Sequence, residues 1–407
     1  MNFLGWVDFS PEHKSRVDSV LDLFLQEGVV DELGVGIIRD ALADKLFPGI
    51  STIQTRAKYY FIIPYIIKDY SSLSPALRNK IFLRNYLSDT EHSIIWDLAE
   101  QYNHIEGKGI IGVTMRRPQK LARRPSSIYW FGILSHGLIK SKLSLAGYLE
   151  KFERKAYDSL KATIYGDDSQ QDAADAEYED LFGINVPYAP NWRDNLSIDL
   201  SNTEADVLKN KFIDRHKNML LGEILKYPAL TRLFISSENF DEFTINLLKD
   251  KSIKVSDDTR NMLQLAYSFS KIMEGAHIRY NCILQNRYGE KGVWEDDWNE
   301  WKVNILEPDI KLDQFDLSEL FDVANRTRDF TKRFIENWSD HIKNRDFNIS
   351  YLDELVSIQE KKNKGRKSRL RQDSSESIDT WIGLRKLSYR FNVSRQIIKD
   401  IVTGLKK

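Results

Sequence analysis

The chain has 407 residues, of which 42% are apolar and 29% charged, and it contains 20 Phe, 18 Tyr and 9 Trp. This length exceeds the roughly 250–300 residues at which a single core stops growing, and the aromatic content excludes an intrinsically disordered chain. The single cysteine, Cys282, excludes disulfides and thiolate zinc sites within the chain. No apolar run approaches the ~20 residues that span a bilayer and no leader pattern opens the sequence, so we expect a cytoplasmic protein without membrane contact.

Hydrophobic spacing predicts a mainly α, multi-helical fold. In the first part of the chain, helices are expected over residues 10–28, 37–46, 51–70 (with a bend at Pro64), from Thr90 onward, and from Ser144 to about 166. Glycines at 107, 109 and 112 surround a short apolar stretch, which predicts one small β hairpin near residues 109–135.

The second part of the chain is also predicted to be helical. Thr203 with Asp206 resembles a capping start, and further helices are expected over residues 257–288, 316–344 and 351–361. Trp294, Trp298 and Trp301 share one helix face, which favours a packed interface over base stacking. The predicted organisation is a helical domain at 1–166, an acidic linker at 167–195, a helical domain at 196–360, a basic linker at 361–377 and a terminal helical hairpin at 378–407.

The formal net charge of −1 conceals a strong separation of charge. Residues 361–407 contain 14 basic and 4 acidic residues, net +10, which leaves net −11 before them. The densest cations suit phosphate neutralisation, although the tail could instead fold onto its own acidic body. The candidate contacts in this segment are Lys364, Arg366, Lys367, Arg369 and Arg371.

A second group of cations lies between two prolines, within a predicted loop at residues 115–130. Guanidinium groups bind phosphates bidentately, and the aromatic residues that follow could stack on a base. Equally, these cations could bind carboxylates of a neighbouring helix while Tyr129 and Trp130 enter the core. The loop contributes the candidates Arg116, Arg117, Lys120, Arg123 and Arg124.

The last 30 residues contain two apolar stripes separated by Asn392, Val393 and Ser394. This layout is typical of a helix-turn-helix with Ser394 as the second N-cap and Arg395, Gln396 and Lys399 facing outward. Any packed helical hairpin has the same pattern, and plain packing is favoured.

Catalytic patterns are largely missing from the sequence, which contains no phosphate-binding loop, nucleophile elbow, metalloprotease or kinase motif. Asp31, Glu32, Asp40 and Asp44 could hold magnesium, but a charged helix face is the favoured interpretation. His277 and Cys282 are expected to be buried core residues. We therefore predict no catalytic set, metal or cofactor, while leaving enzyme activity undecided.

Several segments resemble a bacterial family of unknown function whose members are single chains of about this length. They are Gly5 to Asp8, Asp31 to Ala41, Leu46 to Tyr59, Pro125 to Trp130, Gly365 to Leu370 and Tyr389 to Phe391, so that the resemblance covers nearly the whole chain. It implies membership of multigene antiphage loci of the Azaca type, beside a helicase and a phospholipase-D-like nuclease. It carries over no catalytic residues.

Charge and resemblance together favour a non-catalytic component of an antiviral assembly that contacts DNA or RNA through its basic segments and docks the helicase and nuclease. One alternative is a pure scaffold or regulator without nucleic-acid binding. The other is a divergent metal-dependent nuclease built around the four carboxylates.

Overall fold

The computed structural model describes residues 31–153, 182–289, 292–371 and 380–407. Their regular structure consists of α-helices and short 3-10 turns, and one isolated bridge between Ile139 and Ile184 is the β pairing among them. The predicted mainly α class is confirmed, and the described residues form an all-α fold. The helix expected over residues 10–28 lies outside the described residues. Among the helices described, none combines the length and apolarity needed to cross a membrane.

Two compact units make up the chain, and each is assembled from two separate segments. Unit 1 comprises Met1–Arg39 and Ser268–Leu387, and unit 2 comprises Asp40–Tyr267 and Ser388–Lys407. The division falls within the helices α2 (Gly36–Leu46) and α13 (Asp257–Tyr288). Residues 182–195 of the acidic stretch predicted as a linker at 167–195 therefore belong to unit 2, and residues 167–181 lie outside the described part.

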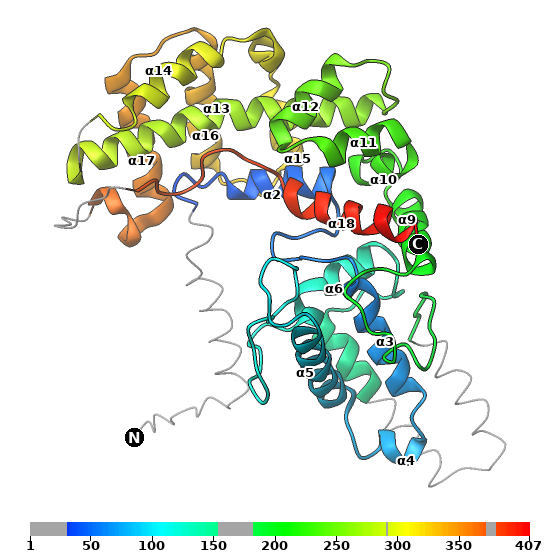
Figure 1. Ribbon diagram of the computed structural model, residues 1–407. Helices are drawn as coiled ribbons and strands as arrows, with labels where there is room; N and C mark the ends of the chain where they lie inside the picture. The colour runs from blue at the N-terminus through cyan, green and yellow to red at the C-terminus, as the bar shows by residue number, and fades with distance from the viewer. Residues whose placement is uncertain (1–30, 154–181, 290–291, 372–379) are drawn as a thin grey trace, which may run out of the picture. The chain divides into compact units, whose positions relative to one another are not determined.

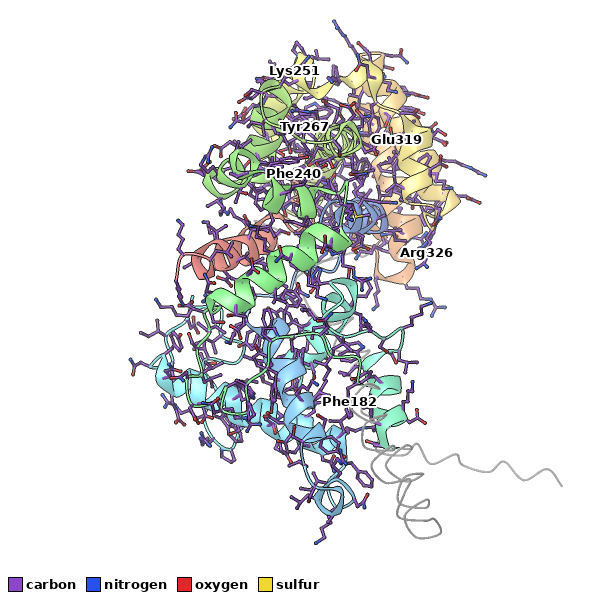
Figure 2. The ribbon with its side chains drawn as sticks, turned by 90° about the vertical axis from the view of Figure 1, so that its right-hand side faces the viewer. Phe182, Phe240, Lys251, Tyr267, Glu319 and Arg326 are labelled. Atoms are coloured by element: carbon purple, nitrogen blue, oxygen red, sulfur yellow. The ribbon has the colours of Figure 1, made fainter. Side chains whose placement is uncertain are left out.

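Unit 2 is built around helices with little polar surface of their own. Helix α3 is buried along almost its whole length and packs against α5 and α6, while α18 packs against α9 and α11. The ring of Phe391 on α18 lies 4.8 Å from that of Phe234, and Phe240, labelled in Figure 2, joins the same core. The unit contains α3 (Tyr59–Ser71), α4 (Pro75–Arg78), α5 (Leu83–Gln101), α6 (Pro125–Ser135), a helical segment at 145–153, α9 (Asn202–Arg215), α10 (Leu220–Lys226), α11 (Pro228–Ser236), α12 (Phe240–Lys249) and α18 (Phe391–Gly404) (Figure 1).

Unit 1 packs its remaining helices against the second half of α13. The Trp338 indole donates to the Ile272 carbonyl at 3.0 Å, and the Trp301 indole donates to the Lys271 carbonyl at 2.8 Å. Trp298 and Trp301 stack at 4.8 Å, so these two residues of the predicted tryptophan face form a packed interface, whereas the ring of Trp294 lies 5.2 Å from that of Trp381. The unit contains α14 (Glu295–Asn304), η2 (Pro308–Ile310), η3 (Leu312–Gln314), α15 (Leu317–Val323), α16 (Asp329–Lys343), α17 (Ile349–Lys364), η4 (Gly365–Lys367) and η5 (Arg369–Arg371).

The predicted β hairpin near 109–135 is wrong, because residues 109–124 form turns and 125–135 form α6. Gly107, Gly109 and Gly112 have φ of 82°, 73° and 70°, values that bend the chain rather than extend it. In addition, the Ile111 amide donates to the Tyr59 hydroxyl at 2.9 Å instead of to a neighbouring strand.

The helix expected from residue 51 starts only at Tyr59, because side chains bind the backbone of the preceding turns. The Gln54 side chain accepts from the Ser51 amide, and the Tyr129 hydroxyl accepts from the amides of Thr55 and Arg56 at 2.7 and 3.0 Å. The helix expected from Thr90 begins earlier, at Leu83. Ser144 is an N-cap as predicted, since its hydroxyl accepts from the Gly147 amide at 3.2 Å.

The cap predicted at Thr203 belongs instead to Ser201. Its hydroxyl accepts from the Glu204 amide at 3.2 Å, and the Glu204 carboxylate accepts from the Ser201 amide at 2.8 Å. This reciprocal pair is a capping box, and it places the start of α9 at Asn202.

The predicted terminal helical hairpin at 378–407 is also wrong, since residues 380–390 form turns and only α18 is helical among residues 380–407. The Ile382 backbone is bonded to the Asn281 side chain at 2.8 and 3.0 Å, which replaces helical hydrogen bonds. Gly383 and Arg390 have positive φ values of 82° and 65°. Ser394, expected as an N-cap, lies within the first turn of α18 and is buried.

Candidate functional site

The predicted basic loop is fastened to one face of α5. Arg117 binds Asp97 at 2.5 Å and Glu100 at 3.1 Å, and its guanidinium lies 5.2 Å from the centre of the Trp96 ring. Lys120 reaches Asp89 at 3.4 Å. Arg117 and Lys120, which were predicted to bind phosphate, thus have carboxylate partners, and so does Arg124, described in the next paragraph. These pairs correspond to the alternative interpretation, in which the cations of the loop bind carboxylates of a neighbouring helix.

Arg124 and the start of α6 converge on a buried carboxylate. Glu91 accepts from the Ser126 amide at 2.6 Å and hydroxyl at 2.9 Å, and Arg124 lies 3.4 Å away. Burial raises the pKa of Glu91 to about 7, although Arg124 and the two bonds from Ser126 oppose the shift. Tyr129 and Trp130 enter the core. Arg116 is exposed and Arg123 half-buried, and neither has an ion pair within the described ranges.

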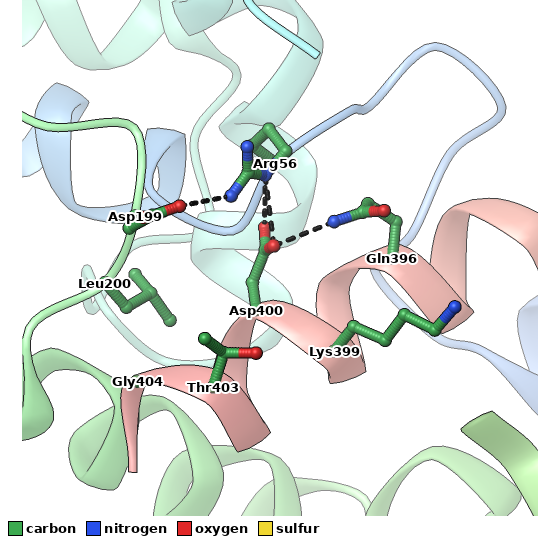
Figure 3. Close-up of a pocket in the computed structure, with 8 residues that line it drawn as sticks. All are labelled: Arg56, Asp199, Leu200, Gln396, Lys399, Asp400, Thr403 and Gly404. Atoms are coloured by element: carbon green, nitrogen blue, oxygen red, sulfur yellow. Dashed lines mark hydrogen bonds and ion pairs between the residues drawn. The ribbon is translucent and has the colours of Figure 1, made fainter. Parts of the chain in front are cut away.

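A charged cavity of about 280 Å³ lies in unit 2 beside α18 (Figure 3). At its centre Arg56 binds both oxygens of Asp400 through Nε at 3.0 and 2.9 Å, and Asp199 through Nη2 at 2.7 Å. Its Nη1 donates to the Lys108 carbonyl at 2.9 Å. Arg56 thereby connects its own segment, residues 55–59, to α18 through Asp400 and to the start of the glycine-rich turns through the Lys108 carbonyl.

Burial controls the carboxylates of this cavity. It raises the pKa of Asp400, which Arg56 and the Ala57 amide only partly offset. Burial also acts to raise the pKa of Asp199, but the bond from Arg56 and the attraction of Lys407 reverse the sign and lower it. The cavity combines both charge signs, so it fits an ion-pair cluster that joins segments better than a site for a single anion.

The three candidates on α18 have different surroundings. Arg395 donates to the carbonyls of Ser237 and Glu238. It was predicted to face outward, but these two bonds hold it against the protein surface. Gln396 donates to Asp400 at 2.8 Å. Lys399 lines the cavity (Figure 3) and is half-exposed. Two of these side chains therefore stabilise the fold.

The basic segment 361–371 in unit 1 is ordered by two buried carboxylates. Glu360 accepts from the Ser368 hydroxyl and from the Arg369 amide at 2.7 Å. Glu32, 1% exposed, lies 3.1 Å from the Lys364 ammonium and 4.0 Å from the Arg369 guanidinium. Burial raises the pKa of Glu32, while Lys364 and Arg369 oppose this.

What this arrangement leaves at the surface is four exposed cations. Lys362, Arg366, Lys367 and Arg371 have no ion pair within the part of the chain that the structure describes. They extend from the last turn of α17 across η4 and η5, whose backbone is also held by Arg287 and Tyr288 of α13. Residues 361–371 of the predicted basic linker (361–377) are therefore folded, and we call these residues the basic ridge; residues 372–377 lie outside the described part of the chain.

The four carboxylates considered for magnesium have separate roles. Asp31 accepts from the amides of Val35 and Gly36 at 2.9 and 2.7 Å, and Glu32 pairs with Lys364. Asp44 binds Arg390 at 2.5 Å, with Asp40 3.9 Å from the same residue. Over the described ranges, no three acidic, histidine or cysteine side chains gather as a metal site. His277 and Cys282 are buried.

Two buried polar groups were missed by the sequence analysis. Lys58 binds Glu204 at 2.7 and 2.8 Å, with Tyr65 donating to the same carboxylate at 2.9 Å. His136 and His216 lie 2.9 Å apart through Nδ1 and Nε2. Each of these partners lies about 80 or more residues away in the sequence, so hydrophobic spacing gave no sign of the pairing.

A family model described as a family of unknown function (DUF6361) matches residues 1–402. The chain belongs to this family. The match covers both units and the basic ridge. Comparison with curated proteins and with solved structures gives no match. Family membership assigns no reaction to the chain.

Proposed function

We propose that this chain is a non-catalytic component of a bacterial antiviral assembly that contacts the phosphate backbone of DNA or RNA through the basic ridge and docks partner proteins. The observation that supports it is the set of four exposed cations, Lys362, Arg366, Lys367 and Arg371, on a folded backbone. A phosphate backbone is recognised by closely spaced cations with releasable counterions.

Order in the ridge improves its suitability for phosphate. A flexible run of cations loses backbone entropy when it binds, whereas the ridge is already held by Glu360, Glu32 and α13. Lys364 and Arg369 neutralise the buried carboxylates, so these two candidates position the ridge and the other cations are available to a ligand.

The loop at 115–130 has a smaller role in this proposal. Two of its pairs with α5, Arg117–Asp97 and Lys120–Asp89, are exposed, with Arg117 at 48% and Asp97 at 47% side-chain exposure, and exposed pairs contribute about 0–1 kcal/mol each. Such weak pairs would leave these cations available to a phosphate, but the carboxylates of α5 beside them, Asp89, Asp97 and Glu100, repel it. Arg116 and Arg123 remain as secondary contacts. The antiviral setting, with a helicase and a phospholipase-D-like nuclease as the docked partners, rests on the family resemblance.

The test is fluorescence anisotropy of the full chain with labelled duplex and single-stranded DNA over a salt series. The triple variant Arg366→Gln, Lys367→Gln, Arg371→Gln should bind at least about tenfold more weakly. Its salt slope on duplex DNA should fall by about two to three, since each phosphate contact contributes about 0.9. A matched control replaces three exposed lysines of unit 2, Lys217, Lys251 and Lys254, by glutamine.

Equal loss in both triple variants would indicate unspecific net-charge attraction and contradict a defined ridge site. Absence of binding by the unaltered chain would favour the second candidate function, a protein scaffold or regulator. That candidate is supported by one specific observation, the pairing of Arg117, Lys120 and Arg124 with α5 carboxylates.

A further inference from the structure

An exposed apolar group lies at the end of unit 2 where α4 joins α5. Leu77 is 46% exposed, Ile81 40% and Phe82 59%, and we call these three residues the apolar tip. The Ile81 amide donates to the Leu77 carbonyl at 3.1 Å, so these two side chains are one helical turn apart and point to the same side. Figure 1 shows α4 beyond the ends of α3 and α5.

The tip is held rigidly although its side chains have no core to enter. The buried Tyr70 hydroxyl donates to the Ile81 carbonyl at 3.0 Å, and Arg78 donates to the Ser71 carbonyl at 2.8 Å. Leu83, directly after the tip, is fully buried. The backbone therefore holds three apolar side chains in water, which is unfavourable unless something covers them.

The charge around the tip indicates what covers it. Residues 76–85 contain three cations, Arg78, Lys80 and Arg84, and no carboxylate. Lys80 and Arg84 are exposed, and among the described residues the ion pair of Arg84 is a long contact of 3.7 Å with Glu153. Projecting apolar side chains with adjacent cations complement a surface that has an apolar interior beneath an anionic outer layer.

We propose that the apolar tip inserts into an anionic lipid surface while Lys80 and Arg84 contact the headgroups. Two of the three side chains are aliphatic and offer no ring on which a base could stack, which disfavours nucleic acid as the occupant. A projecting end needs no complementary groove in a bilayer. Such interfacial binding requires no spanning helix, so it differs from the expectation of no membrane contact, which rested on the lack of a spanning apolar run.

The experiment is flotation of the full chain with phosphatidylcholine vesicles prepared with and without phosphatidylserine. The protein should float with the anionic vesicles, and Phe82→Asp should lower the bound fraction about tenfold. Lys80→Glu should weaken the dependence on phosphatidylserine. Val303→Asp is the matched control, because Val303 is 70% exposed on α14 of unit 1 and should leave flotation unchanged.

Flotation that is absent, or that is unaffected by Phe82→Asp, would overturn the proposal. So would a loss of affinity for a thymidine oligonucleotide in Phe82→Asp without vesicle binding, because that result would assign the tip to base stacking. The ridge variant Arg366→Gln, Lys367→Gln, Arg371→Gln should float like the unaltered chain, so the lipid and nucleic-acid proposals can fail separately.

Discussion

Replacement of Arg56 by methionine should be among the most destabilising single changes in unit 2. The Arg56 side chain is 12% exposed and its partner Asp400 is 4% exposed, so the pair is largely shielded from water. Removing one member of a buried pair typically costs about 3–5 kcal/mol, because the other charge stays buried without compensation. This is a large share of the roughly 5–15 kcal/mol that stabilises a typical domain.

The measurement is urea unfolding of the variant, combined with hydrogen exchange of the α18 amides, Phe391–Gly404. Hydrogen exchange reports on the helix that carries Asp400, which matters because a chain with two units need not unfold in one step. Asp400→Asn should destabilise the unaltered chain but stabilise the Arg56→Met variant, since it then removes an unpaired charge. A loss of less than about 1 kcal/mol in Arg56→Met would refute a buried ion pair at this position.

The dependence on pH provides a second check on the same pair. The pKa of Asp400 is already raised by burial, and without Arg56 it should rise further because an attraction is lost. A carboxyl group whose folded pKa is raised binds more protons when folded, so its unfavourable contribution grows as pH increases. The stability deficit of Arg56→Met should therefore be smaller at pH 5 than at pH 8, and a deficit that grows on acidification would contradict the assignment.

Two further outcomes can be predicted from unit 1. Gly275→Ala directs its methyl group into the Trp301 ring and should destabilise the protein by about 1–3 kcal/mol. Gly147→Ala in unit 2, whose new methyl group would have its nearest contact 3.4 Å away, should instead stabilise the protein by up to about 1 kcal/mol. Thermal denaturation of the two variants measures this difference. Burial lowers the pKa of His277 to about 4 from 6.5, so the contribution of the neutral imidazole to stability should be complete above pH 6.5 and fall by about 3 kcal/mol toward pH 4. In His277→Leu the urea midpoint should lose this part of its dependence on pH. The same dependence on pH in both proteins would refute the prediction.

Hydrophobic spacing was sufficient to predict helices whose own side chains form a core-facing stripe. Helices α2 and α13 agree with their predicted ranges closely, and α3 continues through Pro64 to Ser71. The errors lie where tertiary hydrogen bonds replace local ones. Asn281 binds the backbone of Ile382 across 101 residues, and the Tyr129 hydroxyl binds the 55–56 backbone, so neither segment needs to be helical.

The division into two units also could not be predicted from one sequence. Linear signals such as the acidic stretch at 167–195 suggested a boundary along the chain, whereas each unit joins segments from distant parts of the sequence. Such pairing depends on which faces fit together, for example Gln359 of α17 donating to the Leu33 carbonyl across 326 residues. Local periodicity contains no information about that distance.

The candidate cations demonstrate why composition alone overestimates a binding surface. A cation is available to a phosphate only if no carboxylate holds it, and the carboxylates that decide this lie elsewhere in the sequence: Asp97 for Arg117, Glu91 for Arg124 and Glu32 for Lys364. In the basic ridge the same pairing has the opposite consequence, because Glu32 and Glu360 fix the backbone and leave its other cations exposed. Replacing Glu360 should therefore weaken nucleic-acid binding even though it removes a negative charge, and anisotropy on Glu360→Gln would separate ordered presentation from net charge.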